Sequence, residues 1–151
     1  MEPKIVTKPA FTVVGVKYRG DNKNNEIKHM WDEFGPRMGE IKHVVGPEVC
    51  YGVCANGDEE THEFDYFAGF EVDSTADIPE GMVSFEVPEA TYAVFATTLP
   101  DIGKTFEHAY HTWLPQSGYH ATGGPDLELY DEAFDPSDPY STLYIYIPIM
   151  K

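Results

Sequence analysis

The sequence is poor in cysteine and has no long apolar run. Cys50 and Cys54 are the only cysteines among 151 residues, and two thiols four residues apart cannot form a disulfide framework. No stretch of about eighteen apolar residues occurs, so no transmembrane helix is predicted, and no basic-then-apolar leader opens the sequence. Together these absences favour a cytoplasmic protein whose thiols stay reduced.

Basic residues are scarce over most of the chain. Residues 43–151 hold two of them, Lys104 and Lys151, against twenty acidic residues, whereas residues 1–42 hold eight basic and six acidic ones. The two balances, −18 and +2, sum to the formal charge of −16. This surface repels phosphate backbones and anionic membranes, so we expect neither nucleic acid nor a membrane as a direct partner. The same charge favours a cation in any cleft formed by residues 43–151.

Local motifs of cofactor and metal chemistry are also missing. The chain has no glycine-rich phosphate loop, nucleophile elbow or His-Glu-x-x-His motif, so we expect no cofactor. His108 and His111 lie three residues apart, but no third ligand stands at a diagnostic distance, which favours surface histidines over a metal site. Cys50 and Cys54 have no basic neighbour in sequence that would activate a thiol, which favours small buried hydrophobic residues.

An internal repeat organises the chain. Shifting the sequence by 78 or 79 residues aligns residues 9–16 with 88–95 and residues 46–49 with 124–127. The pattern of each half then predicts a strand interrupted by proline, a helix, and two strands joined by a polar turn. We therefore expect one α+β domain over residues 1–151. Its two similar modules should cover about 1–78 and about 79–151, with a ligand cleft at their junction.

Hydrophobic periodicity predicts the elements of each module. A helix over 25–41 should be interrupted at Gly35-Pro36, and a second helix should start after the N-cap residue Asp101 and end at Pro115. The strands are expected near 11–18, 49–55, 63–72, 82–87, 91–98, 126–131 and 142–149. The helical stripes expected to pack on a sheet are Ile27, Met30, Trp31 and Phe34, and Ile102, Phe106, Tyr110 and Trp113.

Strand alternation singles out Glu128 as a candidate site residue. Within residues 126–130 it shares one face with Tyr130, while two leucines take the other face. In the last strand, Tyr144 and Tyr146 alternate with leucine and isoleucine. If the apolar sides of both strands share a face, tyrosines surround a carboxylate, which is typical of a site for a hydrophobic cation. The competing interpretations are a solvated carboxylate and tyrosines that only pack on a sheet surface.

We therefore expect Glu128 to be the electrostatic anchor of an aromatic pocket. The repeat makes Tyr66 equivalent to Tyr144, so both modules supply rings, whereas the helical stripe that contains two of the candidates is also consistent with core packing. The expected ring residues are Tyr130, Tyr144, Tyr146, Tyr66, Tyr110 and Trp113.

Several longer motifs occur along the chain. They are Trp113–Tyr119, Gly124–Tyr130 and Tyr146–Ile149, with Gly46-Pro47, Tyr51-Gly52 and Glu63–Gly69 in the first half. These motifs resemble the GyrI-like proteins, which include the effector-binding domains of AraC- and MerR-type multidrug regulators. The resemblance implies a tandem pair of βαββ (SHS2-type) modules with pseudo-two-fold symmetry around a central ligand cleft. It also implies that the glutamate at the position of Glu128 pairs with lipophilic cations while aromatic rings stack on them.

The resemblance leaves three functions open. A stand-alone binding protein for lipophilic cationic small molecules is favoured, because it needs only the carboxylate and the rings, and because the regulators' helix-turn-helix domain has no counterpart in this sequence. The first alternative is a hydrolase of cyclopropane-containing or similar strained electrophilic toxins, with Glu128 as the catalytic carboxylate. The second is an inhibitor that acts by binding a protein partner, as the gyrase inhibitor does.

Overall fold

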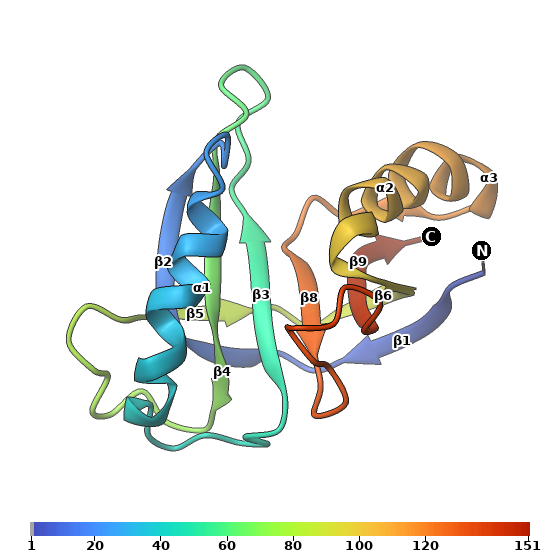
Figure 1. Cartoon of the computed structure of the whole chain (residues 1–151). Helices are drawn as coiled ribbons and strands as arrows, with labels where there is room; N and C mark the ends of the chain where they lie inside the picture. The colour runs from blue at the N-terminus through green and yellow to red at the C-terminus, as the bar shows by residue number, and fades with distance from the viewer. Residues whose placement is uncertain (1) are drawn as a thin grey trace. The chain divides into compact units, whose positions relative to one another are not determined.

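The computed structural model describes residues 2–151 and divides them into two compact units. The α1 unit is Phe11–Val87, and the α2 unit combines the residues up to Ala10 with Pro88–Lys151. Both units are drawn in Figure 1. The first strand therefore folds with the second half of the chain, unlike the expected division near residue 78.

A four-stranded antiparallel sheet forms the α1 unit. β-branched and aromatic residues fill its strands, in the order β3-β4-β2-β5. The helix becomes a 3₁₀ turn at Gly35-Pro36, which confirms the predicted interruption, because proline cannot donate a helical hydrogen bond. The elements are β2 (Phe11–Gly20), α1 (Glu26–Phe34), η1 (Gly35–Glu40), β3 (Cys50–Ala55), β4 (Phe64–Val72) and β5 (Val83–Val87).

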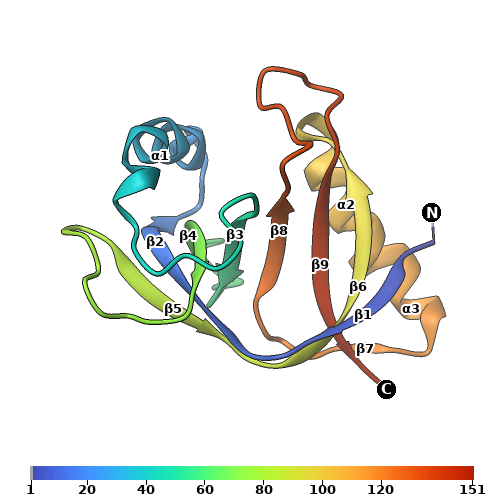
Figure 2. The ribbon, with the colours of Figure 1, turned by 90° about the horizontal axis from the view of Figure 1, so that it is seen from below.

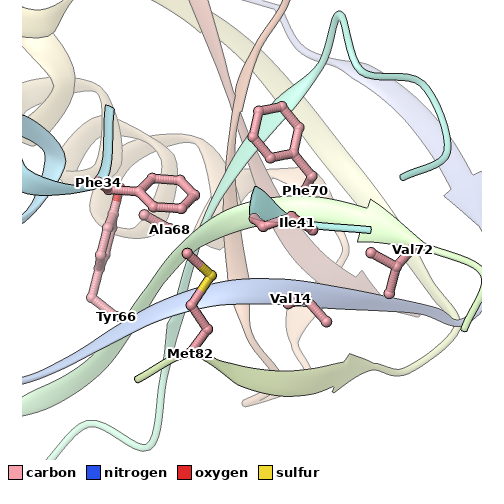
Figure 3. Close-up of a cluster of buried hydrophobic side chains, with 8 residues drawn as sticks. All are labelled: Val14, Phe34, Ile41, Tyr66, Ala68, Phe70, Val72 and Met82. Carbon is pink, nitrogen blue, oxygen red and sulfur yellow. The ribbon is translucent and has the colours of Figure 1, made fainter. Parts of the chain in front are cut away.

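The predicted stripe of α1 packs on one face of this sheet. Phe34 is 1% exposed and lies over Ala68 and Tyr66 of β4, as Figure 3 shows. Ile27, Met30 and Trp31 pack against the same buried cluster. The amphipathic spacing of the helix is thereby confirmed.

The α2 unit repeats this topology. Its strands run in the order β8-β9-β6-β1, which corresponds to β3-β4-β2-β5 in the α1 unit. Two short strands, β1 and β7, were not predicted, and β7 pairs with the end of β9. The strands are β1 (Lys4–Lys8), β6 (Ala90–Thr97), β7 (His120–Ala121), β8 (Asp126–Tyr130) and β9 (Leu143–Met150).

The helix of the α2 unit changes its winding along its length. Pro115 does not end it as predicted, because the helix widens into a π-helical turn just before the proline, where the missing N–H and the ring are tolerated. It ends instead at Gly118, whose φ is 82°. Asp101 stands at the expected N-cap but makes no side-chain capping bond. The segments are η2 (Leu99–Asp101), α2 (Ile102–Glu107), η3 (His108–Trp113) and α3 (Leu114–Ser117).

The predicted stripe of the second helix also packs on its own sheet. Phe95 and Ile145 are at most 1% exposed and belong to the buried cluster beneath the helix. Figure 2 shows α2 and α3 running alongside β6 and β9. Among residues 2–151, no helix is both long and apolar enough to cross a membrane. The stripe residues that pack against this buried cluster are Ile102, Phe106, Tyr110 and Trp113.

Candidate functional site

The register of β8 against β9 determines which side chains accompany Glu128. Glu128 lies opposite Ile145, whereas Leu127 lies opposite Tyr146. Directly opposed residues of an antiparallel pair point to the same face, so Glu128 shares the helix-covered face with Ile145. The expectation that the leucines of β8 and the isoleucines of β9 share a face is therefore wrong. Each strand alternates as predicted, but their relative register is offset by one residue, which reverses the face.

Glu128 is held in a nearly closed environment on this face. Its exposed fraction is 8%, and the Tyr130 hydroxyl donates a hydrogen bond of 2.8 Å to its Oε1. Tyr130 itself packs against the core and meets Phe134 edge-on, with ring centroids 4.9 Å apart. The predicted pairing of Glu128 with Tyr130 on one face is present, and an aromatic hydroxyl fixes the carboxylate.

Asp126 is a second carboxylate on the same face and was not predicted to be a site residue. It lies two residues before Glu128 in β8, and the Tyr110 hydroxyl donates a hydrogen bond to its Oδ1. Burial raises the pKa of Asp126 to about 7, the Tyr110 hydrogen bond lowers it, and the charge of Glu128 raises it. Asp126 could have been predicted from the sequence, because strand alternation places a residue two positions before Glu128 on the same face.

The helix places its two candidate rings differently. Tyr110 lies in the π-helical turn and contacts Asp126, and such turns occur frequently at functional sites. Trp113 instead packs edge-on against Phe95 at 5.6 Å and stacks on Tyr119 at 6.1 Å. Trp113 also lines a surface recess of about 490 Å³ that does not include Glu128. The structure therefore brings Tyr110, but not Trp113, to the carboxylates.

Tyr144 and Tyr146 lie on the opposite face of the α2 unit's sheet. Tyr144 pairs with Leu129, and Tyr146 meets Tyr92 edge-on at 5.6 Å. Burial raises the pKa of Tyr92 to about 12, with a further contribution from the charge of Asp126. These two predicted ring residues therefore do not share the face of Glu128.

Tyr66 belongs to the α1-covered face of the other sheet. It is 1% exposed and lies opposite Tyr18 in the β2–β4 pairing, and its hydroxyl accepts a hydrogen bond of 3.0 Å from Trp31 Nε1. Tyr144 lies on the face that its own helix does not cover, so the predicted equivalence of Tyr66 and Tyr144 is wrong. The offset of the repeat predicts the order of the elements. It does not predict which face of its sheet each aligned tyrosine occupies, because a shift of one residue moves a side chain to the other face.

The cysteine and histidine candidates have separate environments. Burial raises the pKa of Cys50 to about 12, and its thiol donates to the Gly69 carbonyl at 3.3 Å, in keeping with the predicted role as a small buried residue. His111 is exposed as predicted. His108 is only half-buried at the residue level, yet its Nε2 atom is inaccessible and its ring lies edge-on to Phe95 at 6.1 Å. The prediction of a surface histidine is therefore wrong for His108.

Comparison with known protein families shows which family the chain belongs to. Residues 4–149 match the model of Cass2, the integron-associated effector-binding proteins. The chain belongs to the Cass2 family. The resemblance to GyrI-like effector-binding domains is thereby confirmed at the level of the family.

Known proteins similar to this Cass2 member include a regulator and solved structures. The transcriptional regulator BrlR of Pseudomonas aeruginosa is 43% identical over 152 residues, covering 99% of this chain and 56% of BrlR, so the chain spans about half of that relative. SAV2435 bound to tetraphenylphosphonium has a TM-score of 0.77 at 18% identity, covering 99% of this chain and 94% of that chain. A hydrolase from Listeria innocua has a TM-score of 0.55 at 14% identity, covering 99% and 92%. At these identities, the two structures establish the fold alone.

Proposed function

We propose that this Cass2 protein binds lipophilic organic cations on the helix-covered face of β8, with Glu128 as the counter-charge. The observation that carries the proposal is a carboxylate with 8% exposure that lies among aromatic rings. An ionised carboxylate removed from water loses hydration, and a cation of low hydration replaces that loss more effectively than a neutral molecule does.

The surroundings of Glu128 suit such a ligand. Tyr130 and Tyr110 orient their hydroxyls to the two carboxylates, and their ring faces provide polarisable apolar surface. The α2 unit holds four lysine side chains, those of Lys4, Lys8, Lys104 and Lys151, and no arginine, against ten acidic residues. The negative field of this unit therefore favours a positively charged ligand.

The comparisons support the same class of ligand. Cass2 proteins are described as effector-binding proteins, and a structure with the same fold holds tetraphenylphosphonium, which is a lipophilic cation. We extend that class of ligand to this chain because Glu128 supplies a buried carboxyl group on β8.

The function is tested by comparing a cation with a neutral molecule of similar shape. We expect tetraphenylphosphonium to bind and to raise Tm, since a ligand that binds only the folded state stabilises it. Triphenylphosphine oxide presents similar phenyl rings without a net charge and should bind at least tenfold more weakly. Calorimetric titration of both compounds at neutral pH measures the ratio. Absence of binding by a panel of lipophilic cations, or equal affinity for both compounds, would contradict the proposal.

Hydrolysis of a strained electrophile is the second candidate function, and the carboxyl of Asp126 favours it. A group with a pKa of about 7 exchanges protons readily at neutral pH, as a general acid or base must. In a catalytic site, Asp126→Asn and Glu128→Gln should each abolish turnover of a cyclopropane-containing electrophile while the fold remains intact. Chromatographic detection of product decides this, and lack of turnover by the unaltered protein across a panel of such compounds would exclude the candidate.

A further inference from the structure

We propose that Asp126 makes ligand binding a proton exchange: its carboxyl holds a proton in the empty protein and releases it to solvent when a cation binds beside Glu128. This inference rests on the proposed function and adds a second acidic group with a different task. One O–H bond breaks, the proton passes to water or buffer, and the charge of the site changes by the ligand's charge minus the proton's. No other reactant is required.

The geometry provides the reason for two tasks. Asp126 and Glu128 are two residues apart on the same face of β8, which places their backbones roughly 6.6 Å apart. Each carboxylate has its own tyrosine donor, Tyr110 for one and Tyr130 for the other. The two groups therefore form an acidic pair on one face of β8, and a tyrosine hydroxyl donates to each.

Burial and like charge make it costly to ionise both members of this pair. Asp126 is half-buried, Glu128 is 8% exposed, and in a medium of low polarity two neighbouring anions repel strongly. The pKa of Asp126, raised to about 7 by burial and by Glu128 against the effect of Tyr110, agrees with this assignment. A bound cation lowers the cost of the second negative charge, so the proton leaves.

The charged and titratable groups that face Asp126 come from β8, the helix and β6. Within β8 it faces Glu128, from the helix it is contacted by Tyr110, and from β6 the charge of Asp126 acts on Tyr92. On the same helix, His108 turns its ring to Phe95 and His111 is exposed. The neighbours of Asp126 named here are a carboxylate and phenols, so a cation bound beside Glu128 brings positive charge close to Asp126.

The test combines proton counting with a direct view of the carboxyl. We expect tetraphenylphosphonium binding, titrated in two buffers of different ionisation enthalpy, to release up to about half a proton at pH 7, where the carboxyl is half protonated, and up to about one proton at pH 6. Affinity should rise by up to tenfold per pH unit between about pH 5.5 and pH 7 and then level off. In Asp126→Asn, both the release and this slope should disappear. The infrared band of a protonated carboxyl should be present in the unliganded protein at pH 6 and missing in Asp126→Asn.

Stability against pH is the folding control for this variant. Because the carboxyl of Asp126 ionises at higher pH in the folded state than in the unfolded chain, its contribution to stability falls as pH rises from about 4 to about 7. Asp126→Asn should therefore have a higher Tm than the unaltered protein at pH 8 but a similar one at pH 4.5.

The outcomes separate the two proposals. Binding of tetraphenylphosphonium without proton release, or with release that persists in Asp126→Asn, would overturn the proton exchange and leave the proposed function standing. Lack of binding at every pH would overturn both. An infrared spectrum without the carboxyl band, or an unchanged Tm difference across pH, would overturn the assignment of the proton to Asp126 independently of any ligand.

Discussion

Glu128→Gln is expected to weaken the binding of tetraphenylphosphonium about 100-fold, which corresponds to ~2.7 kcal/mol. Glutamine has nearly the same shape and keeps an oxygen that can accept the Tyr130 hydrogen bond of 2.8 Å, so the fold should be retained. The negative charge is lost from a position with 8% exposure, where solvent screening is weak. Calorimetric titration at about pH 8, where Asp126 is ionised, measures the loss.

Two comparisons make this result specific to the position of the charge. Glu132→Gln removes the same charge from an exposed residue four positions later and should change the affinity less than twofold, because water screens that carboxylate. Triphenylphosphine oxide should bind Glu128→Gln and the unaltered protein almost equally. Similar losses for cation and neutral compound, or similar losses in both glutamine variants, would show that Glu128 is not the anchor.

The parts of the fold that could be predicted are those that depend on the residues of a single helix or strand. The stripe that contains Phe34 and the interruption at Gly35-Pro36 follow from local periodicity and from the chemistry of proline, and both are present. The end of the second helix at Gly118 was not predicted, because Pro115 stops an α-helix but is tolerated after a π-helical turn. No bounds were predicted for β1, whose pairing with β6 joins residues more than eighty positions apart in sequence, so local periodicity contains no information about that pairing.

The site was predictable only within a strand. Alternation alone puts Glu128 and Tyr130 together and contains the information that Asp126 accompanies them. Which face of β9 they share depends on the register between two strands, and a shift of one residue exchanges Ile145 for Tyr146. No periodicity in either strand determines that register, so the rings of Tyr144 and Tyr146 were placed on the wrong face.

Gly15→Ala is expected to lower the free energy of unfolding by about 3 kcal/mol or more. Gly15 lies directly opposite Gly69 in the β2–β4 pairing, at the centre of the α1 unit's sheet. A Cβ at Gly15 would lie 1.8 Å from the Ala68 carbonyl oxygen and 2.6 Å from the Gly69 Cα. These atoms belong to the backbone of the neighbouring strand, so no side-chain rotation relieves the overlap and the strands must separate. Thermal unfolding should show a Tm lower by about 6–12 °C.

A second glycine distinguishes the close approach of two strands from a general effect of adding a methyl group. Gly103→Ala places the same methyl group in α2, where nothing lies within 4 Å of the added Cβ, and should raise stability by about 0.5–1 kcal/mol because alanine favours the helix. Gly69→Ala should behave like Gly15→Ala, since its Cβ would lie 2.2 Å from the Val14 carbonyl oxygen. A Tm for Gly15→Ala equal to that of the unaltered protein would mean that β2 and β4 do not approach each other so closely. A loss of stability in Gly15→Ala together with a gain in Gly103→Ala would instead show that glycine is required where the backbones of β2 and β4 are in contact.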